Sequence, residues 1–184
     1  MKFPSLILGV LMAAATLAGA LRSPLDGYTA VPMRQTGINN TDGTTVVVSG
    51  TVQEIRAEMD AMGSSVNWTM TSDSDEDIFC WVGGSGKVEG GPLQDGINYL
   101  KKHDRPCTAD PGPRVCARIS CSWNSAIWLC NDTPNGISHA CADLATYVED
   151  IREECHVGVG RELLIQGQQF DTENFNVLVG KDNC

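Results

Sequence analysis

The feature that most restricts the fold of this chain is a set of eight cysteines that all lie after residue 79. An even number of cysteines in an exported chain indicates a disulfide framework. A zinc site would need close ligand pairs, and the tightest spacing, from Cys116 to Cys121, has no histidine nearby. We therefore expect no metal and four disulfides among Cys80, Cys107, Cys116, Cys121, Cys130, Cys141, Cys155 and Cys184.

The N-terminus has the pattern of a secretory signal peptide. After a positive start, residues 6–18 are apolar, and Ala18 to Ala20 supply the small residues that signal peptidase recognises. Arg22 interrupts the apolar run before it reaches a comfortable membrane span. An uncleaved anchor helix is the alternative. We expect residues 1–20 to be a cleaved signal peptide and the protein to be secreted and extracellular.

The charge of the chain restricts its partners. The chain has 13 basic and 23 acidic residues and a net charge of −10 at pH 7. Such a surface repels phosphate backbones and anionic lipid. We therefore expect no nucleic acid partner, no stable membrane insertion, and an extracellular protein or glycan as the target. The composition does not indicate an oligomeric state.

The cysteines also divide the chain. Residues 21–75 contain none, and residues 76–184 contain all eight. We interpret the first part as an N-terminal extension and the second as a cysteine-rich domain. Residues 21–43 are rich in Pro, Gly, Asn and Thr, which predicts a loop. The rest of the extension is expected to hold a short strand at 45–48 and a helix opened by a capping box at 51–54.

Hydrophobic patterns in the cysteine-rich domain predict four strands and two helices. Strands are expected at 78–82, 114–121, 126–130 and 175–179, with the second and third joined as a hairpin around 122–125. The helices are expected to start at Pro92 and at a Ser138 cap. The second helix has inward positions at spacings of three and four residues, which are Cys141, Leu144, Val148, Ile151 and Cys155.

This order of elements predicts the fold class. The sequence β-α-β-β-α-β is that of the ferredoxin-like split βαβ plan. We expect an α+β fold with an antiparallel sheet and two helices on one face. Disulfides would staple this domain, and the N-terminal extension would precede it.

Four stretches of the cysteine-rich part are informative in element order and cysteine placement: 115–121, 124–127, 137–155 and 175–184. Through these stretches, residues 76–184 resemble the killer protein 4-like family of fungal secreted proteins, which includes virus-encoded killer toxins and fungal effector relatives. The resemblance implies a compact extracellular α/β fold, no cofactor, and action on other cells. Toxin members stop the growth of competing fungi by interfering with calcium uptake, whereas relatives act at the host–fungus interface. The toxins are generally basic, whereas this chain is acidic.

Eight cysteines allow 105 pairings, so their spacing alone does not choose one. In the predicted hairpin, Cys116 lies one residue from direct register with Cys130, which favours that bridge. Cys121 and Cys184 lie at the ends of strands that the predicted plan brings together. The resemblance to the toxins assigns the remaining pairs, Cys107–Cys141 and Cys80–Cys155.

The sequence contains no recognisable catalytic constellation. The chain has three histidines, His103, His139 and His156, and the expected positions of His139 and His156 at helix ends give those two a structural explanation. No Gly-x-Ser-x-Gly motif or spare cysteine supplies a nucleophile. No cofactor-binding motif is present either. We therefore expect the protein not to be an enzyme. A small secreted hydrolase that acts on a glycan or on RNA is the alternative.

The hairpin carries the candidate binding residues. Trp123, at its tip, would stack on a sugar or insert into a partner, or would equally well cover the disulfides as local core. Arg118 is the nearest charge to Cys121 and the second candidate. Asn-x-Ser/Thr sequons at Asn39, Asn67 and Asn131 predict a glycoprotein.

We expect a secreted, small, cysteine-rich effector or toxin-like protein of fungal type. It would act in virulence or competition by binding a target on another cell. A hydrolase is the first alternative. A structural protein of the cell wall or spore surface is the second.

The signal-peptide prediction has a direct test. Since Ala18 to Ala20 match the cleavage pattern, N-terminal sequencing of the secreted protein should begin at Leu21. A secreted chain that starts at Met1 would contradict the prediction.

Overall fold

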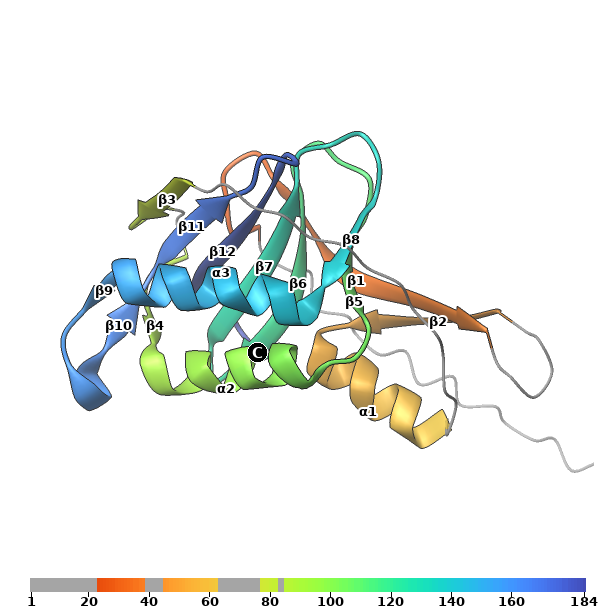
Figure 1. Cartoon of the computed structure of the whole chain (residues 1–184), viewed down its shortest axis with the longest axis horizontal. Helices are drawn as coiled ribbons and strands as arrows, with labels where there is room; N and C mark the ends of the chain where they lie inside the picture. Colours follow the sequence, from red (N-terminus) through yellow and green to blue (C-terminus); the bar gives the residue numbers. More distant parts are fainter. Residues whose placement is uncertain (1–22, 39–44, 63–76, 83–84) are drawn as a thin grey trace, which may run out of the picture.

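The structure is a computed structural model that describes residues 23–38, 45–62, 77–82 and 85–184. Figure 1 shows helices α2 (Gly90–Lys102) and α3 (Cys141–Glu154) on one face of a large sheet, with α1 (Val52–Met62) to one side. The strands of this sheet are β1 (Thr29–Ile38), β2 (Thr45–Gly50), β3 (Asp77–Cys80), β6 (Val115–Ser122), β7 (Ser125–Asn131), β11 (Gly167–Phe170) and β12 (Phe175–Lys181).

The large sheet has seven strands in the order β2-β1-β6-β7-β12-β11-β3. Two smaller sheets join short strands: β4 (Val88–Glu89) with β10 (Leu164–Ile165) and β9 (His156–Val157), and β5 (Pro106–Ala109) with β8 (Ile137–Ala140). A single 3₁₀ turn, η1 (Gly160–Glu162), precedes β10. The α+β class is confirmed, and the sheet is mixed because β1 runs parallel to β6.

The ferredoxin-like strand order is not confirmed. In a split βαβ unit, one strand separates the two strands that flank a helix. β7 and β11, on either side of α3, fit this description because β12 lies between them. β3 and β6, on either side of α2, are separated by three strands. Two pairings account for the difference: β12 pairs directly with β7, and the unpredicted strand β11 lies between β12 and β3, which leaves β3 at the edge of the sheet.

The buried side of α3 follows the predicted pattern. The five expected inward residues, from Cys141 to Cys155, are all buried. The predicted start at Ser138 is wrong, since α3 begins at Cys141 and residues 137–140 form β8. Ser138 lies opposite Thr108 in the β5–β8 ladder, so its backbone takes part in a strand rather than in a helix cap.

The segment that was predicted to be a loop at 21–43 contains the long strand β1, so that prediction is wrong over residues 29–38. The strand at 45–48 and the capping box are confirmed: the Thr51 N–H donates to Glu54 Oε2 at 2.7 Å. Met33, Ile55 and Met59 belong to the same apolar core as Leu93 of α2. The division of the chain at residue 75 stays a prediction, but both parts supply one core.

A polar contact also joins the two parts of the chain. Gln35 Nε2 of β1 lies 3.2 Å from His103 Nε2, at the C-terminal end of α2. Burial lowers the pKa of His103 to about 4, so the imidazole is neutral at pH 7. This histidine is therefore a buried structural contact.

The structure contains the four disulfides named from the sequence: Cys80–Cys155, Cys107–Cys141, Cys116–Cys130 and Cys121–Cys184. A β-bulge lies between Arg118 and Ser120. It shifts the pairing of the two hairpin strands by one residue from the regular register expected from the turn. The bulge places Cys116 directly opposite Cys130 instead of one residue away.

Gly167 allows β11 to approach the disulfide at the end of α3, and its replacement tests this contact. A Cβ atom at Gly167 would lie 2.8 Å from Ile151 Cγ2 and 2.9 Å from Cys155 Sγ. We expect Gly167→Ala to lower the free energy of unfolding by about 1–3 kcal/mol through overpacking. Chemical denaturation would measure the change.

Gly91→Ala is the matched control, because a Cβ atom at Gly91 in α2 meets nothing within 4 Å. We expect this variant to be unchanged or more stable by up to about 1 kcal/mol, since alanine favours helix. Equal stability of the two variants would contradict the close approach at Gly167.

Candidate functional site

The tip of the β6–β7 hairpin presents a large aromatic side chain to solvent. Trp123 and Asn124 both have positive φ, 46° and 63°, as the two central residues of a type I′ hairpin turn require. Asparagine tolerates this conformation, whereas a bulky residue rarely adopts it. Trp123 is 82% exposed, so it does not cover the disulfides as local core. Packing therefore does not explain why tryptophan occupies this position.

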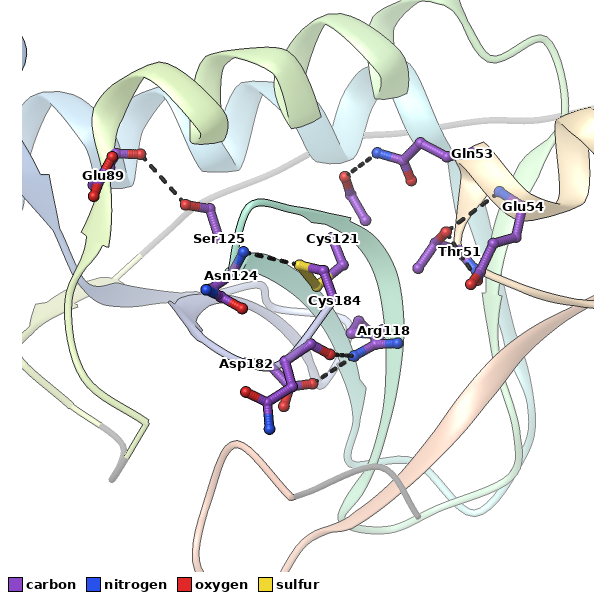
Figure 2. The surroundings of a disulfide bond; sticks show 12 residues. Thr51, Gln53, Glu54, Glu89, Arg118, Cys121, Asn124, Ser125, Asp182 and Cys184 are labelled. Atoms are coloured by element: carbon purple, nitrogen blue, oxygen red, sulfur yellow. Dashed lines mark hydrogen bonds and ion pairs between the residues drawn. A yellow bond between two sulfur atoms is a disulfide. The ribbon is translucent and has the colours of Figure 1, made fainter. Parts of the chain in front are cut away.

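The C-terminal segment holds the turn in place. Cys184 forms a disulfide with Cys121, which only Ser122 separates from the turn. The Asn124 N–H donates to Cys184 Sγ at 3.1 Å. The Asp182 N–H donates to the Asn124 carbonyl oxygen at 3.2 Å. Figure 2 shows Asn124 facing Cys184 and Asp182 facing Arg118 beside this disulfide. The disulfide and these hydrogen bonds therefore form a fixed support for the turn that carries Trp123.

Arg118 lies close to this support, but its charge is already paired. Its Nη1 donates to Asp182 Oδ2 at 2.7 Å and to the Asn183 carbonyl oxygen at 2.8 Å. The guanidinium carbon also lies 5.9 Å from the ring centroid of Trp128. Since the Arg118 side chain is only 13% exposed, it holds the C-terminal segment rather than offering a free cation to a target.

The sheet face opposite α2 and α3 carries a second apolar cluster that sequence reasoning missed. Its buried members include Trp128 and Leu178, and Leu25 and Tyr28 of the N-terminal segment pack against them. Tyr28 Oη donates to the Asp132 carboxylate at 2.9 and 3.0 Å. Burial, together with this hydrogen bond, raises the pKa of Tyr28 to about 12. The neutral hydroxyl therefore fixes the segment to the sheet.

Of the three predicted glycosylation sites, Asn39 and Asn67 lie outside the described residues. Asn131 is completely buried at the end of β7. Its Nδ2 atom donates to the carbonyl oxygens of Asp110, at 2.9 Å, and Asn135, at 2.6 Å. Because both amide hydrogens are used and the side chain has no access to solvent, this geometry opposes glycosylation of Asn131 in the folded protein.

A small cavity beside His139 brings together several titratable groups. His139 stacks on Phe175, and burial lowers the pKa of the imidazole. Tyr147 Oη donates to Asp171 Oδ2 at 2.5 Å, and Glu173 also lines the cavity. The cavity volume of about 20 Å³ has room for one water molecule. It does not admit a sugar ring or a nucleotide in this conformation.

The partly buried Arg118–Asp182 pair can be tested against an exposed pair of the same length. Arg118→Ala leaves the Asp182 carboxylate, 8% exposed, without its partner, so we expect a loss of about 3–5 kcal/mol in the free energy of unfolding. The exposed Lys101–Glu149 pair also spans 2.7 Å, and Lys101→Ala should cost less than about 1 kcal/mol. Similar losses in the two variants would show that Arg118 does not hold the C-terminal segment.

In the described part of the chain, no group of three or more His, Cys, Asp or Glu side chains is arranged to hold a metal ion. Among the same residues, no helix combines the length and apolar character needed to cross a membrane. A comparison of the chain with protein-family models, curated proteins and solved structures finds no match.

Proposed function

We propose that this protein is a secreted, disulfide-stapled effector or toxin-like protein that binds a target on another cell through Trp123. The observation that carries the proposal is the exposed Trp123 side chain on a backbone conformation that bulky residues rarely adopt. Residues held in such conformations cluster at functional sites. Tryptophan is also enriched among the residues that dominate binding energy.

The support beneath Trp123 favours binding. The disulfide of Cys121 and the hydrogen bonds of Asn124 fix the turn before any partner arrives. A fixed binding residue loses less conformational entropy when it binds. Because Arg118 is paired with Asp182, the proposed contact is aromatic rather than cationic.

The location outside the cell is part of the proposal. Four disulfides are consistent with an oxidising compartment. The resemblance of residues 76–184 to killer protein 4-like proteins supports a fungal origin and a role in virulence or competition. The cavity beside His139 is too small for a sugar ring or a nucleotide in this conformation, which counts against a hydrolase centred on that histidine.

Replacement of Trp123 tests the proposal. Labelled wild-type protein should bind to the surface of host cells or of competing fungal cells. Trp123→Ala should weaken this binding by tenfold or more, since an aromatic anchor contributes roughly 2 kcal/mol or more. The free energy of unfolding should stay within about 0.5 kcal/mol of wild type because the side chain is exposed.

Tyr99→Ala is the matched control, because Tyr99 is an aromatic residue of α2 that is 47% exposed. This variant should bind as the wild type does. The proposal is wrong if Trp123→Ala retains full binding, or if both variants lose binding equally. Incorporation of the protein into the wall of the producing cell alone would favour the structural alternative.

A further inference from the structure

A second site lies on the sheet face opposite α2 and α3, where the N-terminal segment meets the end of β12. A cavity of about 420 Å³ opens there, a volume typical of small-molecule sites. It lies apart from the exposed tip at Trp123, which does not line it. The lining residues are Ser23, Pro24, Leu25, Asp26, Ser85, Trp128, Lys181, Asp182 and Asn183.

Two of the lining residues have polar atoms without a partner. Trp128 Nε1 and Ser85 Oγ are buried and form no hydrogen bond with any described residue. Trp128 is only 1% exposed, and a buried tryptophan N–H normally has an acceptor. A ligand that brings acceptor atoms, with a small adjustment of the lining, would form hydrogen bonds that the described residues do not offer to these two groups.

The charges around the cavity restrict what that ligand is. Lys181 contributes one cation, and Asp26 and Asp182 contribute carboxylates, so the lining both donates and accepts hydrogen bonds. Asp182 is already paired with Arg118. The net charge of −10 disfavours an anionic ligand, and the polar lining disfavours a purely apolar one. A neutral ligand with several hydroxyl groups matches these conditions.

We propose that this cavity binds a neutral saccharide unit. Its oxygen atoms accept from Trp128 Nε1 and Ser85 Oγ, and its hydroxyl groups donate to the Asp26 carboxylate. Because Trp128 is only 1% exposed, it contributes its indole N–H after a small adjustment of the lining rather than a stacking surface. This proposal does not depend on a contact between Trp123 and a macromolecular target.

The indole N–H resonance of Trp128 tests the site in the full secreted chain. The chain has four tryptophans, and Trp128→Phe identifies the resonance by its disappearance. Titration with chitotriose, laminaritriose and mannotriose in separate samples should move this resonance saturably for at least one saccharide. Inorganic phosphate and acetate, titrated in the same way, should leave it unmoved.

Asp26→Ala keeps the experiment decisive if Trp128→Phe fails to fold, because Asp26 is exposed at the rim. In that case, the resonance is assigned by elimination, from single Trp→Phe variants of the other three tryptophans, Trp68, Trp81 and Trp123. Asp26→Ala should weaken saccharide binding roughly three- to tenfold through the loss of a hydrogen bond to a charged group. Asp60→Ala, on the exposed side of α1, is the control and should bind as wild type.

Three results would overturn the proposal. They are the absence of a shift with all three saccharides, a shift with phosphate or acetate alone, and equal affinity of Asp26→Ala and wild type. Retained saccharide binding by Trp123→Ala would support two separate sites. The failure of either proposal is therefore distinguishable from the failure of the other.

Discussion

The structure depends most on the two disulfides that hold α3 at both ends. Cys141 joins the start of the helix to Cys107 in β5, and Cys155 joins its end to Cys80 in β3. These anchor points lie ~21 Å apart at 1.5 Å per residue. The two bridges close loops with sequence separations of 75 and 34 residues, and each is typically worth about 2–5 kcal/mol. They fix the direction of α3 across the sheet, and α2 packs beside it.

The parts of the fold that sequence reasoning predicted depend on local signals. The capping box at Thr51 and Glu54 involves residues three positions apart, and the hairpin around Trp123 joins neighbouring strands. The inward residues of α3 follow from helical periodicity alone. Local signals were not enough to predict the four disulfide pairs. Two of the pairs were predicted from the hairpin and the order of strands, and two from the family resemblance.

The parts that were missed depend on contacts between distant segments. Pro32 and Gly37 interrupt the strand pattern of β1, and its parallel pairing with β6 joins positions far apart in the chain. The bulge before Ser120 leaves no clear signal in the sequence of β6. The cavity at Trp128 combines residues near both ends of the described chain with Ser85, so no local motif indicates it. The exposure of Trp123 could not be predicted from the sequence either, because the hairpin turn is held by the C-terminal segment, which is distant in the chain.

The functional proposals both depend on this cross-linked support, because Cys121–Cys184 fixes the hairpin tip and the segment that lines the cavity. The most direct test of the account is therefore a disulfide map of the secreted protein, obtained by mass spectrometry of peptides digested without reduction. The account predicts Cys80–Cys155, Cys107–Cys141, Cys116–Cys130 and Cys121–Cys184. A map in which Cys80 pairs with Cys141, or Cys107 with Cys155, would reverse the attachment of α3 and contradict it.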